Sequence, residues 1–197
     1  MTPSLEQIQW PVRTERLRLR RLTEQDLEAT WSYRKLPEVA QWITAGPHDF
    51  ETYREQFLQS GKIDLDVAVE LQTPDGQLRL IGTVMVYIKD AWGQREIVEQ
   101  TKSVEAELGW SFDPQFAGQG YASEAVLKVM EICFEDLGLR RVVAECFAAN
   151  KPSVKLMERV GMRREAFEKA NSLHRSGVWM DSYAYALLAD EWSAHRG

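Results

Sequence analysis

The 197-residue chain has little of what membrane-spanning and secreted proteins need. Its apolar residues never form a run near the ~18 that a membrane helix requires, and its first twenty residues lack the apolar core of a signal peptide. It has only two cysteines, Cys133 and Cys146, and they do not have metal-ligand spacing. We therefore expect two buried, free thiols in a cytoplasmic protein that does not enter a membrane.

Positive charge is also scarce. Lysine and arginine number 24 against 30 aspartates and glutamates, and the net charge is −6 at pH 7. This balance argues against a nucleic-acid partner held by the overall field, and it suits a cationic small substrate better. The three histidines, His48, His174 and His195, are scattered without ligand spacing, so no metal site is expected.

The chain does have enough apolar residues, 44% of the total, to bury the core of one large domain. We expect this domain to cover residues 1–197, with 1–12 as an N-terminal extension. Hydrophobic patterning predicts strands at 16–22, 65–72, 78–88, 103–112, 141–148, 162–170 and 179–188. Helical patterns cover 23–35, 51–60, a segment ending near 137, and 150–160. The order predicts a mixed α/β (α+β) fold: a central, mostly antiparallel twisted sheet of about seven strands with helices on both faces.

Two glycines, Gly118 and Gly120, stand where the strand at 103–112 gives way to the most strongly patterned helix. Glycine there leaves backbone N–H groups uncovered at the positive end of the helix dipole, which is a suitable site for an anion such as a phosphate. A tight turn with no ligand is the alternative interpretation. The sequence has neither the third glycine of a Rossmann fingerprint nor the G-K-[ST] of a P-loop, which argues against both nucleotide sites.

The pattern Q-x-x-G-x-G at residues 115–120 resembles the pyrophosphate loop of the GNAT acetyltransferase superfamily. The segments ELGWSFDPQFAGQGYASEA, AANKPSVKLMERVGM and WMDSYAYALLADEW, after the opening TERLRLRRLTEQDLEA, resemble successive landmarks of its RimJ/RimL-type branch. The resemblance implies a GNAT fold with a splayed cleft for acyl-CoA, and acetyl-CoA as co-substrate without a metal.

The resemblance also implies which residues bind the donor. Backbone groups of one strand would pair with the pantetheine arm of CoA: Leu108, Gly109, Trp110, Ser111 and Phe112. The following loop would hold the pyrophosphate: Gln115, Phe116, Ala117, Gly118, Gln119, Gly120, Tyr121 and Ala122. Asn150 and Ser153 would contact the CoA arm, although Asn150 before Pro152 is also a favourable helix N-cap without any ligand.

Glu105 and Glu107 share one face of the strand at 103–112, and crowding with partial burial would raise the pKa of at least one of them. An amine attacking a thioester needs a proton acceptor, and Glu107, in the E-[IL]-G-[YW] pattern of the branch, is the expected base. Positioning the substrate or pairing with an arginine is its alternative role. Many GNAT members carry a tyrosine acid seven residues after the asparagine. Met157 stands there, so the resemblance assigns the acid step to Ser153 instead.

The acceptor is the least determined part of the expected site. Trp42, Trp92 and Glu105 are candidate substrate-binding residues, although such aromatics are often simple core. We expect transfer to a primary amine by direct attack in a ternary complex, the acceptor being a protein N-terminal α-amine or a small amine. A non-catalytic acyl-CoA-binding sensor of the same fold is the alternative. The protein is expected to be a monomer or a homodimer.

Overall fold

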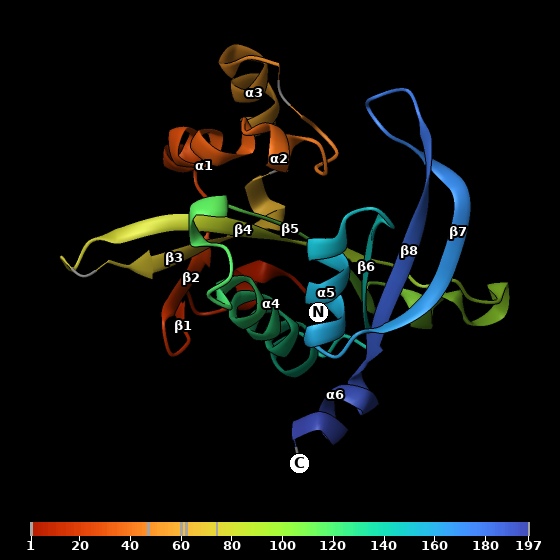
Figure 1. The fold of residues 1–197 in the computed structure, drawn as a ribbon. Helices are drawn as coiled ribbons and strands as arrows, with labels where there is room; N and C mark the ends of the chain where they lie inside the picture. Colours follow the sequence, from red (N-terminus) through yellow and green to blue (C-terminus); the bar gives the residue numbers. More distant parts are fainter. Residues whose placement is uncertain (1, 47, 60, 62, 74, 197) are drawn as a thin grey trace. The chain divides into compact units, whose positions relative to one another are not determined.

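The computed structural model describes residues 2–46, 48–59, 61, 63–73 and 75–196, with side chains as far as residue 194. The chain divides into two compact units (Figure 1). We call Gln9–Met85 with Trp110–Val126 the N-unit, and Met1–Ile8 with Val86–Gly109 and Leu127–Gly197 the C-unit. Two strands and one helix each contribute residues to both units, and the units are described separately below.

The N-unit is built on antiparallel strands in the order β1-β2-β3-β4. Its strands are β1 (Val12–Arg13), β2 (Leu17–Arg21), β3 (Asp66–Gln72) and most of β4 (Leu78–Lys89). Its helical elements are η2 (Glu24–Asp26), α1 (Leu27–Arg34), α2 (Pro37–Ala40), α3 (Phe50–Phe57), η3 (Ile63–Leu65), η5 (Pro114–Phe116) and the start of α4 (Tyr121–Glu131). Helices α1, α2 and α3 lie together (Figure 1), and α3 packs Tyr53 and Phe57 against Leu22 and Ala68.

Local sequence accounts for the helix starts in this unit. The side chain of Asp26 accepts hydrogen bonds from the backbone N–H and the hydroxyl of Thr23, at 2.9 and 3.0 Å. Asp49 caps α3 by accepting from the backbone N–H of Thr52 at 2.8 Å. Asp26 also receives two bonds of 2.7 Å from Arg20 on β2, which fastens the helix start to the sheet.

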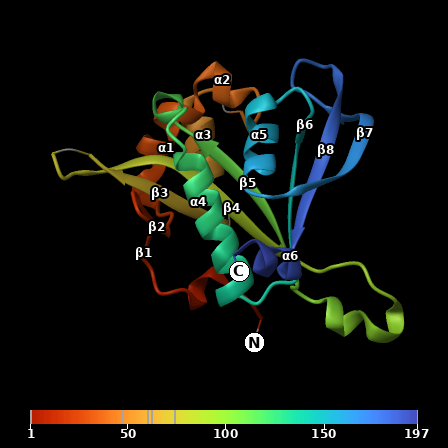
Figure 2. The same ribbon diagram turned by 60° about the horizontal axis from the view of Figure 1, so that its bottom comes forward.

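The C-unit contains the strand order β5-β6-β8-β7. Its strands are β5 (Glu105–Phe112, up to Gly109), β6 (Arg141–Phe147), β7 (Arg163–Leu173) and β8 (Trp179–Leu188), together with the end of β4. Its helical elements are η1 (Leu5–Gln7), η4 (Arg95–Thr101), the end of α4, the π-helix η6 (Ile132–Asp136), α5 (Lys151–Arg159) and α6 (Ala189–Arg196). Strands β6, β8 and β7 lie side by side, and the segment between β4 and β5 extends away from them (Figure 2).

Strand β5 pairs with β6 in parallel, whereas β6 with β8 and β7 with β8 are antiparallel. The expected mixed, mostly antiparallel α/β fold is therefore confirmed. The predicted stripe of the α4–η6 segment is also confirmed, because Ala125, Val126, Val129, Met130 and Cys133 are fully buried.

Several elements of the described residues were not predicted, among them β1, α2, η4 and α6. Strand β1 makes the strands of the described residues eight rather than about seven, and its two residues are too few to show an alternation. The short helix α2 lies in a segment expected to be irregular, η4 lies in an expected polar loop, and α6 continues directly from β8. The expected end of the second helix, Ser60, lies outside the described residues.

Candidate active site

The glycine loop precedes α4 in the N-unit. Gly118 and Gly120 have φ of +78° and +82°, a left-handed conformation that favours glycine and that the tight-turn interpretation also requires. A Cβ built on Gly118 would meet nothing within 4 Å, so the backbone conformation, and not lack of space, requires glycine there. The same open space lets an anion approach the loop backbone at the N-terminus of an eleven-residue helix. The loop therefore fits a phosphate group.

An arginine that the loop sequence does not contain lies against this loop. Arg16 Nη1 donates to the carbonyl oxygen of Gln119 at 2.9 Å, and its guanidinium lies 4.6 Å from the ring centre of Tyr121. Glu124 in the first turn of α4 holds it through Nε at 2.6 Å. The loop sequence itself carries no cation, and only the fold shows this one, because Arg16 precedes β2.

The surroundings of Glu124 favour its ionised form. Burial raises the pKa of this carboxyl, but bonds from the Thr14 hydroxyl and from the backbone and side chain of Arg16 bring the pKa below its ordinary value. Its negative charge holds Arg16, whose guanidinium also bonds to the carbonyl oxygen of Gln119 in the loop. The Arg16 side chain is 41% exposed.

A second arginine contacts the start of the loop from β4. Arg79 Nη2 donates to Oε1 of Gln115 at 3.1 Å, and the guanidinium lies 4.9 Å from the ring centre of Phe116. The buried carboxylate of Asp113 is 3.6 Å from Arg79 and accepts from the backbone N–H of Gln115 at 3.0 Å. Arg79 on β4 and Asp113, which follows β5, thus hold η5 in place.

The last part of the predicted pantetheine strand also lies in the N-unit. Ser111 is buried with its hydroxyl 3.3 Å from that of Thr83. The ring of Phe112 covers Gly82 so closely that a Cβ there would be 2.3 Å from Cδ1. These side-chain contacts fix the direction of β5 immediately before the loop.

In the C-unit, the register of β5 with β6 runs from Glu105↔Arg141 to Glu107↔Val143, and it does not extend to Leu108 or Gly109. The pairing of β5 with β6 therefore ends at the residue expected to be the base. An end of pairing at this point agrees with strands that separate to admit a ligand, although the splayed cleft itself stays a prediction.

The two glutamates of β5 have different cationic partners. Glu107 Oε2 accepts from Nζ of Lys89 at 2.7 Å, and about one third of each side chain is exposed. Glu105 pairs with Arg140 at 3.1 Å and lies 3.9 Å from Arg141. One alternative role for Glu107 was pairing with an arginine, and the structure has a lysine from β4 as its partner. No sequence signal links these two residues, because strand pairing brings them together.

Asn150 and Ser153 lie together at the start of α5, where Asn150 Oδ1 accepts from the backbone N–H of Ser153 at 3.3 Å. The predicted N-cap is confirmed. The Ser153 hydroxyl is buried and contacts the thiol of Cys146 on β6. Burial raises the pKa of this thiol to about 11, and the contact with Ser153 lowers it in part.

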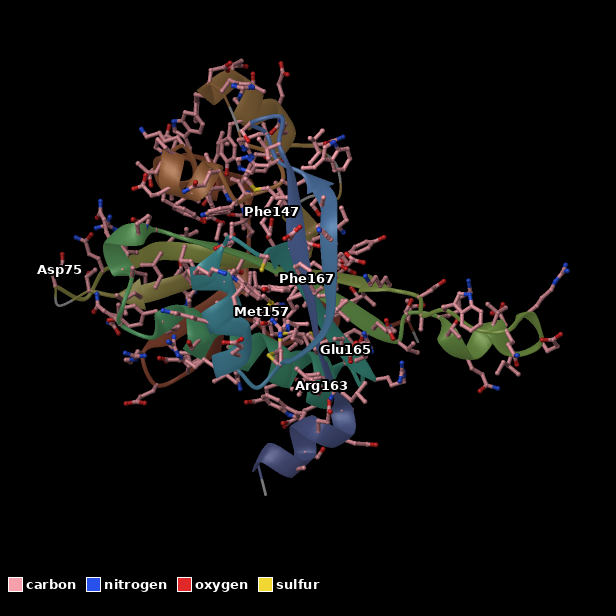
Figure 3. All side chains as sticks on the ribbon, turned by 45° about the vertical axis from the view of Figure 1, so that its right-hand side comes forward. Asp75, Phe147, Met157, Arg163, Glu165 and Phe167 are labelled. Atoms are coloured by element: carbon pink, nitrogen blue, oxygen red, sulfur yellow. The ribbon has the colours of Figure 1, made fainter. Side chains whose placement is uncertain are left out.

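Met157 lies on α5 (Figure 3) and is fully buried. At the end of α5, Gly161 has φ of +86°, and Met162 N donates to Met157 O at 3.0 Å, which confirms the expected left-handed stop.

The candidate acceptor residues are divided between the two units. Trp42 lies in the N-unit just after α2, whereas Trp92 lies in the C-unit with 89% of its surface exposed. Glu105 is in the C-unit and is paired with arginines as described above. The proposed roles of all three stay predictions.

Both cysteines are free, but the expected burial of both was wrong, because only Cys133 is buried and Cys146 is half-buried. The described residues contain no group of three His, Cys, Asp or Glu side chains that could hold a metal ion. In the same part of the chain, no helix has the length and apolar character to cross a membrane.

Known proteins are similar to this chain in sequence and in fold. The family described as acetyltransferase (GNAT) domain matches residues 16–163. The uncharacterized N-acetyltransferase YnaD of Bacillus subtilis (strain 168) is 31% identical over 92% of this chain and 99% of its own length. A crystal structure of a GNAT-family acetyltransferase from Bacillus anthracis superposes with a TM-score of 0.76 at 30% identity, covering 92% of this chain and 99% of that one. The ribosomal protein uS5-alanine N-acetyltransferase of Escherichia coli (strain K12) is 28% identical over 45% of each chain.

Enzymes of the matched family acetylate amines with acetyl-CoA as the donor. Both the family match and the relative of nearly equal length agree with the fold. The chain belongs to the GNAT acetyltransferase family and is an N-acetyltransferase with RimJ/RimL-like relatives.

Proposed function

We propose that the chain acts as one GNAT domain that transfers the acetyl group of acetyl-CoA to a primary amine. The transfer is a direct attack in a ternary complex, and the acceptor is the α-amine of a protein N-terminus or a small amine. The observation that carries the proposal is the loop before α4, with two left-handed glycines and an arginine held beside its backbone.

In this proposal the backbone of residues 117–122 binds the pyrophosphate of CoA. Gly118 provides the close approach, and Arg16 adds the positive charge that the loop itself lacks. Glu124 keeps Arg16 in place. The backbone of residues 108–112 binds the pantetheine arm, and Asn150 and Ser153 are assigned to the CoA arm by the resemblance alone.

The chemistry needs a neutral amine and a stabilised leaving group. Glu107 accepts the proton of the incoming ammonium, and a backbone N–H near Leu108 donates to the oxyanion. Ser153 donates a proton to the departing thiolate, whose pKa near 8.5 makes this help small. Met157 is fully buried and cannot act as the acid, because its thioether has no proton to donate.

Two kinds of acceptor have different support. The relative in Escherichia coli is named for an alanine of ribosomal protein uS5, which favours a protein N-terminus. The net charge of −6 favours a small cationic amine. Both kinds carry the same reacting group, so the proposed residues serve either.

The test is release of free CoA thiol from acetyl-CoA with a panel of acceptors. Peptides that begin with alanine or serine represent protein N-termini, and spermidine and free amino acids represent small amines. We expect turnover with one class. Glu107→Gln should lower kcat about a hundredfold, whereas Glu96→Gln, at an exposed acid of η4 in the same unit, should not change it.

Binding of CoA should be measured for each variant by calorimetry. Tight binding of CoA without thiol release for any acceptor would contradict the proposal. An unchanged rate in Glu107→Gln would exclude the assigned base and leave the loop assignment standing.

A further inference from the structure

Lys89, the last residue of β4, places its amine on the proposed general base. Its Nζ donates to Oε2 of Glu107 at 2.7 Å, within one unit of the chain. The exposed fractions are 31% for Lys89 and 34% for Glu107, so solvent and solutes reach both groups. A primary amine of the chain thus occupies the position that an acceptor amine must reach.

This position differs from that of a lysine in an ordinary surface ion pair. Lys102 in the same unit pairs with Asp90 at 2.9 Å, and both side chains are about half exposed. Asp90 lies in the connection between β4 and β5, whereas Glu107 lies on β5 immediately before the proposed pantetheine-binding backbone of Leu108. Lys89 therefore has both a carboxylate partner and a position beside the proposed donor-binding strand. Lys102 has a carboxylate partner but does not pair with a residue of that strand.

We propose that Lys89 is a self-acetylation site of the enzyme. This inference rests on the proposed function of Glu107 as base and of β5 as donor-binding strand. The Lys89 ammonium gives one proton to the Glu107 carboxylate, and the neutral Nζ attacks the thioester carbonyl carbon of acetyl-CoA. The C–N bond forms as the C–S bond breaks, CoA leaves as the thiolate, and the second amine proton passes to that thiolate through solvent. The products are acetyl-lysine and free CoA.

The modification changes the site in a definite way. Acetylation removes the positive charge of Lys89, so its ion pair with Glu107 is lost. The carboxylate of Glu107 then becomes available to an incoming ammonium. The unmodified enzyme holds its base on an internal amine, and the acetylated enzyme presents the base to an external one.

The experiment uses the full-length protein incubated with acetyl-CoA in the absence of any acceptor. Intact-mass spectrometry counts acetyl groups with time, and peptide mapping locates them. We expect one acetyl group per chain at Lys89, added about a hundredfold faster than at Lys102. The rate constant should be independent of protein concentration, because the donor and the amine belong to one complex, and excess free CoA should slow the reaction.

Two variants support the assignment. Lys89→Arg keeps the cation and should carry no acetyl group, and Glu107→Gln should slow labelling of Lys89 to the rate at Lys102. The comparison of Lys89 with Lys102 in the unaltered protein does not depend on the folding of either variant.

Three outcomes would overturn the inference. Equal labelling of Lys89 and Lys102 would mean non-enzymatic acetylation. An unmodified Lys89 in enzyme that acetylates an external amine would overturn self-acetylation and leave the proposed function standing. No CoA binding, no labelling and no turnover would overturn the proposed function together with this inference.

Discussion

Arg16 Nε lies 2.6 Å from Oε2 of Glu124, and the two residues are 108 positions apart in the chain. The same guanidinium bonds to the carbonyl oxygen of Gln119 in the glycine loop. The segment before β2 is thereby tied to the N-terminus of α4. In the proposed function, donor binding at the loop depends on a residue that lies far from the loop motif in sequence.

Loss of this cation should weaken binding of CoA. Arg16→Gln removes a charge-assisted contact to a phosphate, and we expect about a tenfold rise in the Kd for CoA measured by calorimetry. The loss should shrink as salt is raised, because partly exposed charges are screened. Arg54→Gln, at an exposed arginine paired with Glu51 on α3, is the control and should leave the Kd unchanged. An equal effect in both variants would mean that overall charge, and not the loop, binds CoA.

The two functions of Gly118 can be separated by comparison with Gly177. Both have positive φ, +78° and +80°, and both have open space where a Cβ would lie. Alanine at either position should therefore cost about 1 kcal/mol of stability through backbone strain. Only Gly118→Ala should also raise the Kd for CoA, because Gly177 lies in the turn between β7 and β8. Thermal unfolding and calorimetry on both variants check this, and equal CoA affinities would remove the loop from the donor site.

Restoring the tyrosine that many family members carry should not restore an acid. Met157 is fully buried on α5, so Met157→Tyr must place a larger, polar side chain in a closed space. We expect a loss of about 1–3 kcal/mol in the free energy of unfolding and no gain in kcat. Denaturant unfolding and thiol-release kinetics measure the two effects. A faster enzyme of unchanged stability would show that this position faces the reacting groups.

Asp26 should make stability depend on pH in the acidic range. Burial raises the pKa of this carboxyl, but the bonds from Arg20 and Thr23 together lower the pKa by more, so the folded pKa is below the ordinary value. The stabilisation is therefore fully present above the unfolded pKa of about 3.9 and is lost as the pH falls through the folded pKa. Asp26→Asn should cost about 2 kcal/mol at pH 7, and the difference from the unaltered protein should vanish in strong acid.

Chemical denaturation between pH 7 and pH 2.5 tests this dependence. Asp64→Asn breaks only a surface pair with Arg21, in which Asp64 is 71% exposed, and it should change stability little at any pH. A constant difference between the Asp26 variant and the unaltered protein down to pH 2.5 would contradict the assigned cause.

The elements that the sequence predicted are those that depend on neighbouring residues. Helices start or end through bonds that span only a few positions, as at Thr23 with Asp26, at Asn150 with Ser153, and at Gly161. The stripe of α4 and the alternation of the strands also repeat within short windows. Elements without such a window, the two-residue β1 and the four-residue α2, were missed.

The sequence by itself determined the mixed fold through periodicity and capping, which are local properties, and it indicated the family and the glycine loop through short motifs that resemble those of GNAT acetyltransferases. Only the tertiary structure decided which charges meet. It placed Arg16 at Gln119, Arg79 at Gln115 and Lys89 at Glu107, pairs separated by 103, 36 and 18 positions. Such pairs form when strands and helices pack, and a single sequence carries no periodic signal of a contact between distant segments.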